Sequence, residues 1–423
     1  MEHDLVLEGR VVTPQGITER EVGVGEGLVA EIGVGLRGSR RIRAGRCIVF
    51  PGFVDMHVHL REPGWEAKED FRTGTRAAAH GGVTTVVDMP NNPTPIASLA
   101  ALEAKRRLAA KALVDVRLYG MVLPERLGSL REMAEGVVGY KVYLSETTGV
   151  GSFPESELGR ALSAVAETGR PASLHCEKQS VIDRAKKELE GVQAPDLHCD
   201  LRPPEAEREA VREVVAAVRE TPGVRTNICH ASTGATLGMA REARSEGLKL
   251  YCEATLHHLY FNRRAMVENR LLQTNPPLRA EEDRQSLLAG LRDGGVSFLV
   301  TDHAPHLLSE KVEGGRSGVP GLDDYAHVVS WLVREQGVDP LVIARVASGN
   351  PSKFLSLGDR GEVAVGMRAD FTVIDLHSPE KAIDDAVQSK CGWTPYEGRE
   401  FPGRARWTIT GGKVALDDFE IAC

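Results

Sequence analysis

The chain has 423 residues, of which 42% are hydrophobic and 26% charged, and its formal net charge at pH 7 is −8. This is the composition of an ordinary globular protein, and no stretch gathers Lys and Arg into the basic patch of a nucleic-acid-binding protein. No apolar run reaches the roughly 18 residues of a transmembrane helix, and the first residues lack the order of a signal peptide. We therefore expect neither nucleic acid nor a membrane as a partner.

The seven cysteines include no Cys-x-x-Cys pair. Because their number is odd and their spacing irregular, they indicate neither a disulfide framework nor a thiolate zinc finger. The cytoplasm is therefore the expected compartment.

Short strands separated by glycine-rich turns are predicted at both ends of the chain. The candidates are Leu5–Val12, Val22–Val24, Val29–Ile32 and Arg46–Phe50, followed near the other end by Gly361–Asp375 and Arg406–Leu416. Neither group alone offers enough strands for a good core. We expect residues 1–51 and 351–423 to combine into one small β-sandwich domain.

Between these ends, nearly continuous apolar runs alternate with helical patterns, as expected for strands buried on both faces. The strand candidates are Phe53–His57, Val83–Met89, Val114–Val122, Val137–Leu144, Ala172–His175, Val224–Cys229, Leu248–Glu253 and Ser297–Thr301. Helices are predicted in the intervals, for instance over Leu99–Ala112, Ser156–Thr168, Glu205–Thr221 and Ala235–Ser245. This α/β pattern favours a (β/α)8 TIM-type barrel over residues 52–350 rather than a doubly wound sheet.

The strongest local signal is Asp55-Met56-His57-Val58-His59-Leu60-Arg61, at the end of the first barrel strand. Side chains alternate along a strand, so His57 and His59 point the same way and could hold one metal ion together. For this pair alone, two histidines without a ligand role remain the alternative.

Further metal-competent residues lie at or just after the ends of later strands: Lys141, His175, His230 and Asp302. In a TIM barrel these ends converge on one mouth, where active sites are built. A buried neutral lysine can add carbon dioxide and become a carbamate that bridges two cations. An ion pair between Lys141 and an acid such as Glu146 is the alternative. Together, the strand ends predict a metal site.

Several segments of the chain form a characteristic series: Pro51–Gly64, Asp88–Pro93, Gly139–Tyr143, His257-His258, Asn275–Arg279, Thr301–His306 and Gly366–Asp370. In these motifs the chain resembles the cyclic amidohydrolases, and dihydroorotases in particular. The resemblance implies a zinc-dependent hydrolase that acts on cyclic amide C–N bonds. The implied reaction is the reversible cyclisation of N-carbamoyl-L-aspartate to L-dihydroorotate and water in de novo pyrimidine biosynthesis.

The resemblance also implies the ligands of two zinc ions. His57, His59 and Asp302 would hold the more buried ion, His175 and His230 the more exposed one, and carboxylated Lys141 would bridge them. A hydroxide activated by both ions would attack the ring amide, and Asp302 would act as the catalytic base that passes a proton to the leaving nitrogen. Some dihydroorotases have an aspartate bridge, so Lys141 is typical of the carbamate-using kind.

Dihydroorotate carries a free carboxylate, which calls for fixed donors beside the metal ions. Arg61 follows His59 by two residues, so its planar guanidinium is predicted to face the mouth and to bind that carboxylate. A surface salt bridge is the alternative for Arg61. The resemblance adds Asn92 and His306 to the carboxylate clamp, and Asn275 as a contact to the ring.

Two further features stay open at the level of sequence. A third zinc ion could be held by Cys229, Glu253 and His257 or His258, because all three residue types are zinc ligands; packing behind the main site is the alternative. The glycine-rich stretch 313–321 could be a mobile lid or a plain surface loop. Pro320 and Gly321 are expected to contact substrate through their backbone.

Two other functions are compatible with parts of the pattern. An allantoinase shares the barrel, the His-x-His pair and the lysine bridge, but resembles the chain less at Arg61 and at Asp302–His306. A non-catalytic partner protein of the same superfamily should lack metal ligands, whereas every ligand position is filled here. The resemblance further implies a homodimer and association with aspartate transcarbamoylase.

Overall fold

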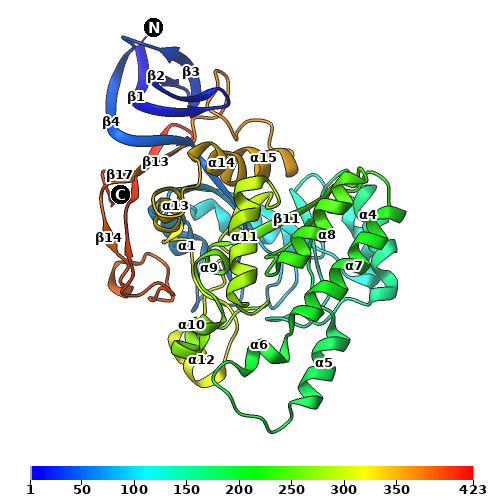
Figure 1. Cartoon of the computed structure of the whole chain (residues 1–423). Helices are drawn as coiled ribbons and strands as arrows, with labels where there is room; N and C mark the ends of the chain where they lie inside the picture. The colour runs from blue at the N-terminus through cyan, green and yellow to red at the C-terminus, as the bar shows by residue number, and fades with distance from the viewer. Residues whose placement is uncertain (1, 423) are drawn as a thin grey trace.

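Eight parallel strands form a ring at the centre of the molecule in the computed structural model, which describes residues 2–422 (Figure 1). They pair in chain order: β5 (Phe53–Val58), β6 (Val83–Asp88), β7 (Asp115–Met121), β8 (Gly139–Tyr143), β9 (Ala172–His175), β10 (Thr226–Ile228), β11 (Leu250–Thr255) and β12 (Phe298–Val300). The ring closes where Val58 bridges His303 and the His59 N–H donates to the His303 carbonyl over 2.7 Å. The predicted barrel is confirmed.

Helices follow the strands and cover the outside of the ring. Those of the barrel are α1 (Phe71–His80), α2 (Leu99–Leu108), α3 (Leu130–Met133), α4 (Leu158–Ala166), α5 (Gln179–Glu188), α6 (Leu197–Leu201), α7 (Pro204–Glu220), α8 (Gly234–Ser245), α9 (Leu256–Tyr260), α10 (Arg263–Glu268), α11 (Glu281–Asp293), α12 (Leu308–Gly314) and α13 (Tyr325–Arg334). In α7, Pro204 stands in the first turn, and Ala210, Val211, Val214 and Val218 recur at the spacing of one buried helix face.

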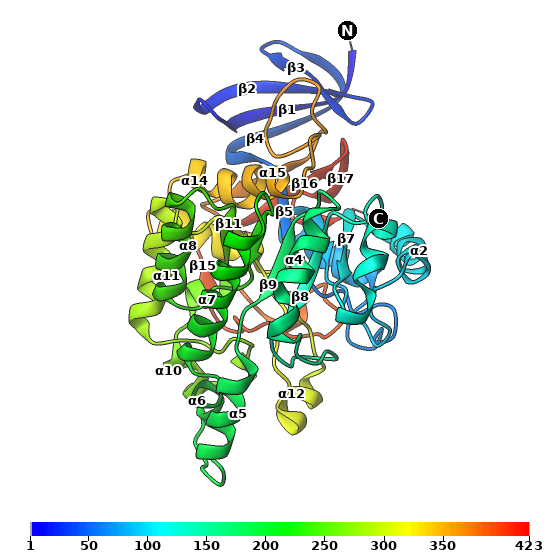
Figure 2. The same cartoon turned by 90° about the vertical axis from the view of Figure 1, so that its right-hand side faces the viewer.

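Both ends of the chain contribute to one separate sheet at the amino-terminal end of the barrel (Figure 2). Its order is β18 (Glu420–Ile421), β17 (Lys413–Asp417), β16 (Arg404–Thr410), β13 (Phe371–Asp375), β4 (Arg37–Pro51), β1 (Glu2–Thr13), β2 (Gly16–Gly25) and β3 (Leu28–Gly33). All pairs are antiparallel except β1 with β4. Apolar side chains from both ends share one core, which includes Leu7, Val49, Val373 and Ile409. The small β-domain built from the two termini is confirmed.

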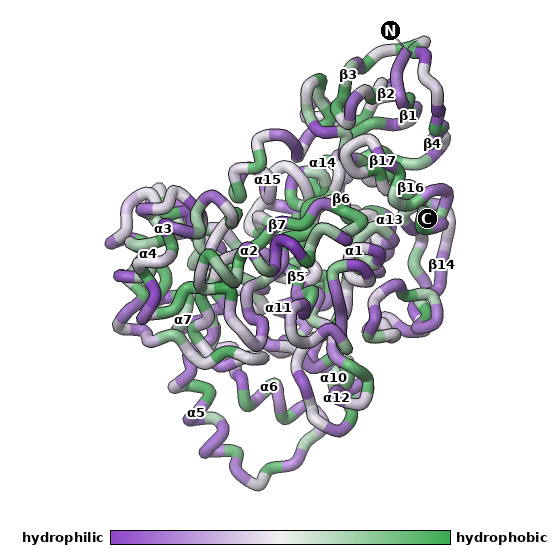
Figure 3. Tube along the Cα trace, turned by 180° about the vertical axis from the view of Figure 1, so that it is seen from behind, coloured by the Kyte–Doolittle hydropathy of each residue, from purple (hydrophilic) through white to green (hydrophobic). Residues whose placement is uncertain are grey.

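The hydrophobic colour of Figure 3 gathers on barrel strands such as β6, while the outer helix α5 is mostly hydrophilic. β5, β6, β8 and β9 are buried along their whole length, which explains their unbroken apolar character. Within residues 2–422, no helix combines the length and the apolarity needed to cross a bilayer.

The segment between β13 and β16 runs back from the terminal sheet to the mouth of the barrel. It holds the short hairpin of β14 (Glu380–Lys381) and β15 (Glu400–Phe401). The indole N–H of Trp393 donates to the His306 carbonyl over 2.8 Å, and the Ser389 hydroxyl donates to Glu69. The end of the chain therefore helps to hold the loop that follows β12.

One buried histidine ties this segment to α13. His327 Nδ1 lies 3.1 Å from Asp324 Oδ1, and its Nε2 lies 2.9 Å from Glu380 Oε2. Burial opposes a charge on His327, but the hydrogen bonds to the two carboxylates outweigh it and raise its pKa from 6.5 to about 9.

A His327→Gln variant should therefore be destabilised in a pH-dependent way. The folded pKa lies above the unfolded one, so the stabilisation is fully present below pH 6.5 and is lost as the pH rises through about 9. The difference in free energy of unfolding between wild type and variant should shrink by up to about 3 kcal/mol over this range. Denaturant unfolding at several pH values measures it, with the exposed His377→Gln as the control. A difference independent of pH would contradict the assignment.

Candidate metal and active site

The carboxyl ends of the barrel strands bring the predicted metal ligands together. His57 and His175 lie on β5 and β9, and His59, His230 and Asp302 follow β5, β10 and β12 within two residues. All five line one small cavity at the mouth. Lys141, on β8, is fully buried beside it.

Their ligand atoms lie close enough to share metal ions. The Nε2 atoms of His57 and His59 are each 3.2 Å from Asp302 Oδ1. His175 Nδ1 lies 2.9 Å from His230 Nε2. Ligand atoms of His57, His230 and Asp302 all lie within 4.8 Å of one another. The candidate metal ligands therefore form two groups that face the same cavity, one around Asp302 and one at His175 and His230.

Three of these histidines use their second ring nitrogen to contact a neighbouring acceptor. His57 Nδ1 donates to Glu253, His59 Nδ1 to Asn91 Oδ1 over 2.8 Å, and His175 Nε2 to Glu177 Oε2 over 2.8 Å. Such contacts fix the ring orientation and leave the opposite nitrogen unprotonated, which is the form that binds a metal ion. The donor set fits a metal centre.

The charge states also suit metal binding. Burial lowers the pKa of His59 to about 3 and holds that of His230 well below its ordinary value, so both rings are neutral. Burial alone would raise the pKa of Asp302, but the attraction of His57 and His59 outweighs it and keeps that pKa well below the usual range. Asp302 is therefore an ionised carboxylate.

Three residues of the site have the left-handed backbone conformation that favours glycine. Arg61, His230 and Asp302 have φ values of 63°, 35° and 49°. Non-glycine residues persist there only when their surroundings hold them, and such residues cluster at functional sites. The backbone thus turns each side chain toward the cavity at a conformational cost.

Lys141 has an unusual environment for a buried cation. Its Nζ lies 2.7 Å from the Cys229 sulfur and 5.1 Å from the centre of the Tyr143 ring. Among residues 2–422, no carboxylate, that of Glu146 included, lies within 4 Å of this nitrogen. Burial raises the pKa of the Cys229 thiol well above its usual range, so that sulfur supplies no negative charge.

The residues predicted to bind substrate divide into two groups. Arg61 and Asn275 line the cavity, together with the predicted metal ligands. Asn92 and His306 lie behind Arg61: the Asn92 amide donates to the Arg61 and Pro63 carbonyls over 3.2 and 3.0 Å, and His306 Nε2 lies 3.4 Å from the guanidinium. They therefore contact the arginine rather than the cavity.

The residues predicted near the glycine-rich loop are placed differently. Pro320 and Gly321 do not line the cavity, and the Gly321 N–H donates to His303 Nδ1 over 3.1 Å. Ser317 and Gly318 line it instead. The Lys311 ammonium, on α12, donates to the carbonyls of Gln273, Arg316 and Gly318 over 2.8 to 2.9 Å, which fixes this loop over the mouth.

The residues considered for a third zinc ion are only partly brought together. Cys229 and Glu253 lie with His57, their ligand atoms within 4.8 Å of one another. His258 is outside this group, since its ring nitrogens bond the Thr255 hydroxyl and the Pro277 carbonyl.

Sequence reasoning missed several residues of the site. Asn91 and Glu177 orient His59 and His175, and Tyr143, Thr147 and Thr148 line the cavity. A signal was present for the first two, because Asn91 lies three residues after the end of β6 and Glu177 stands two residues after His175. The same period-two argument that paired His57 with His59 would have found Glu177.

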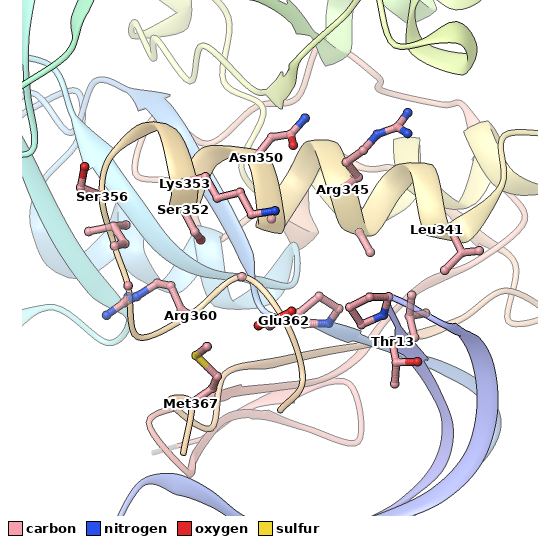
Figure 4. Close-up of a pocket in the computed structure, with 18 residues that line it drawn as sticks. Thr13, Leu341, Arg345, Asn350, Ser352, Lys353, Ser356, Arg360, Glu362 and Met367 are labelled. Carbon is pink, nitrogen blue, oxygen red and sulfur yellow. The ribbon is translucent and has the colours of Figure 1, made fainter. Parts of the chain in front are cut away.

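A larger cavity of about 670 Å³ lies at the opposite, amino-terminal end of the barrel (Figure 4). It separates the terminal sheet from the helical segment of α14 (Pro340–Ala344) and α15 (Asn350–Phe354). Thr13, Ser352 and Met367 line it, but no His, Cys or Asp does. The smaller cavity is therefore the candidate active site, because four histidines and Asp302 line it, whereas the larger one, although lined by Arg345 and Arg360, has no histidine.

Comparison with known proteins agrees with this geometry. Residues 48–414 match the family described as "Amidohydrolase family", and the chain belongs to that family. The family is metal-dependent, as the cluster at the mouth leads one to expect. The prediction of an amidohydrolase is confirmed.

Individual relatives indicate which members of the family the chain is similar to. The chain is 35% identical over 410 residues to a dihydroorotase of Methanothermobacter thermautotrophicus, covering 95% of this chain and 91% of the relative. It is also 31% identical over 442 residues to an allantoinase of Solibacter usitatus, covering 100% and 95%. Among solved structures, an L-hydantoinase (dihydropyrimidinase) from Arthrobacter aurescens superposes with a TM-score of 0.96 at 26% identity, covering 100% of this chain and 98% of that one. Dihydroorotases of further organisms match at 31–35% identity.

An Asn91→Ala variant tests whether the orienting contacts matter for metal binding. Loss of the acceptor for His59 Nδ1 should weaken metal affinity by about 10- to 100-fold, because the ring loses its fixed orientation and tautomer. Competition with a chelator, followed by metal analysis, measures the affinity. The control is Asn262→Ala, which removes a cap of α10 and a hydrogen bond to Glu281 at a residue that does not line the cavity. Equal affinities in the two variants would show that Asn91 is not needed.

Proposed function

We propose that the chain is a dihydroorotase that interconverts N-carbamoyl-L-aspartate and L-dihydroorotate plus water. Its similarity to dihydroorotases over nearly the whole chain supports this proposal. The reaction requires a group that polarises an amide carbonyl, a proton carrier, and a cation for the substrate carboxylate. The cavity at the mouth has candidates for all three.

The observation that carries the proposal is the position of Arg61. Its guanidinium is buried and lines the same cavity as Asp302 and the four histidines. Burial lowers the pKa of Arg61 to about 10, so the side chain remains positively charged at neutral pH. A buried cation beside a metal site suits a ring that carries a carboxylate, whereas a neutral ring has no need of it.

We assign two zinc ions to this site. His57, His59 and Asp302 would hold one ion and His175 and His230 the other, with Lys141 as a bridging carbamate. Full burial of Lys141 without a carboxylate partner within 4 Å supports this modification, because no ion pair would have to be broken for its amine to add carbon dioxide. A third ion at Cys229 and Glu253 stays a prediction.

Zinc supplies Lewis acidity, which polarises the ring carbonyl and lowers the pKa of water. In the hydrolytic direction, Asp302 accepts a proton from the attacking water and passes it to the leaving ring nitrogen. Arg61 binds the substrate carboxylate and Asn275 contacts the ring, so the scissile amide lies beside Asp302. In the biosynthetic direction the same groups close the ring and release water.

Allantoinase is the second candidate function, because the allantoinase of Solibacter usitatus matches the whole chain. A purely structural partner protein is less compatible, since the complete set of ligands is present. Assays of the purified protein with dihydroorotate and allantoin, side by side and with metal analysis, separate these functions. We expect turnover of dihydroorotate by protein that contains about two zinc ions per chain. Turnover of allantoin alone would reject the proposal.

The role of Arg61 can be tested by Arg61→Lys. Lysine keeps the charge but loses the planar fork, so the KM for dihydroorotate should rise by about 10-fold or more. Bound metal should be unchanged, because Arg61 is not among the metal ligands. Steady-state kinetics and metal analysis measure the two effects, and kinetics equal to wild type would remove Arg61 from the site.

Three expectations from the sequence remain predictions. They are the homodimer and the association with aspartate transcarbamoylase, which the resemblance implies, and the cytoplasmic location expected from the cysteine pattern.

A further inference from the structure

A lysine on the outer helix α2 is buried against the strand ends. Lys105 is 1% exposed, and its ammonium contacts three acceptors. Its Nζ lies 2.8 Å from Asp88 Oδ2, 2.8 Å from Asn92 Oδ1 and 2.9 Å from the Met89 carbonyl. A buried cation with three contacts of this length is expensive to desolvate and must be matched by its partners.

Both side-chain partners of Lys105 hold the backbone on which Arg61 stands. Asp88 Oδ1 accepts the Leu60 N–H over 2.8 Å. The Asn92 amide donates to the carbonyls of Arg61 and Pro63 over 3.2 and 3.0 Å. Lys105 is thus connected to the backbone around Arg61 in two ways. Asp88 links it to Leu60, and Asn92 links it to Arg61 and Pro63.

The ammonium and the two carbonyls favour the same orientation of the Asn92 amide. With Lys105 at its oxygen, the nitrogen of the amide is turned toward the two carbonyls. Without the cation, this orientation would lose its charge-assisted bond, and a flipped amide would place its oxygen against the carbonyl oxygens. Arg61 has a φ of 63°, a strained conformation that persists only while its surroundings hold it.

We propose that Lys105 is a positioning residue that sets the Arg61 guanidinium for the substrate carboxylate. It acts through Asp88 and Asn92 and touches no substrate atom. The inference rests on the proposed function, because it assigns selectivity for a carboxylate-bearing ring to a side chain outside the cavity. It goes beyond a role in packing, since it predicts an effect on one part of the substrate only.

The test compares wild type with Lys105→Met, which keeps the length of the side chain but removes the cation. Orotate and uracil serve as inhibitors, because they share a ring and differ by the carboxylate. We expect inhibition by orotate to weaken by about 10- to 100-fold, as for the loss of a supporting contact, while inhibition by uracil is unchanged. The KM for dihydroorotate should rise by a similar factor, with a smaller change in kcat.

Metal content and a control variant separate positioning from general damage. Bound metal should equal that of wild type, although Asn91, next to Asn92, contacts His59. The control variant Arg106→Met removes an exposed cation from the same helix. Inhibition by orotate and by uracil should be the same in this variant as in wild type. If Lys105→Met does not fold, the double variant Lys105→Met, Asp88→Asn avoids an unpaired buried carboxylate and still removes the contact to Asn92.

The outcomes are distinct. Wild type that does not turn over dihydroorotate overturns the proposed function, and this inference with it. If wild type is active, but inhibition by orotate and inhibition by uracil weaken equally or not at all in the variants, the inference alone is overturned. Selective weakening of orotate at constant metal content supports it.

Discussion

The site depends on histidines that are held in a fixed orientation inside a buried, polar mouth. An imidazole offers a lone pair to a metal ion only when its proton resides on the other nitrogen, and Glu253, Asn91 and Glu177 fix that choice for three of the four rings. Burial lowers the pKa of His59, His175 and His230, but it does not by itself orient any ring. The three acceptors lie on or after three different barrel strands, so the fold of the barrel places each acceptor beside its histidine.

The fold could be predicted because its signals are local. The barrel strands are buried on both faces, so their apolar runs are continuous and each predicted strand overlaps an observed one. The terminal sheet was harder. β4 extends over Arg37–Pro51, far beyond the expected Arg46–Phe50, because its first half is partly exposed and reads as polar. Pairing between β4 and β13 joins residues some 320 positions apart in the chain, which no local pattern encodes.

The site divides in the same way. His57, His59 and Arg61 share a strand and its continuation, so their common direction follows from a period of two. The same period does not predict which residues lie behind these three side chains. Asn92 and His306 contact Arg61 rather than the cavity, and Gly318 rather than Gly321 faces it, because turns after the strands set these directions. Motifs indicate which residues gather at a mouth, whereas rotamers and loop geometry decide which atoms reach the cavity.

The contact between Trp393 and the His306 carbonyl has a consequence for the order in which the site is completed. Synthesis runs from the amino terminus, so all barrel strands leave the ribosome before this tryptophan and before β16 and β17. The nascent chain therefore lacks both the last strands of the terminal sheet and the brace behind the loop that follows β12. The loop after β12 therefore gains this contact only after Trp393 has been synthesised and has folded back onto it.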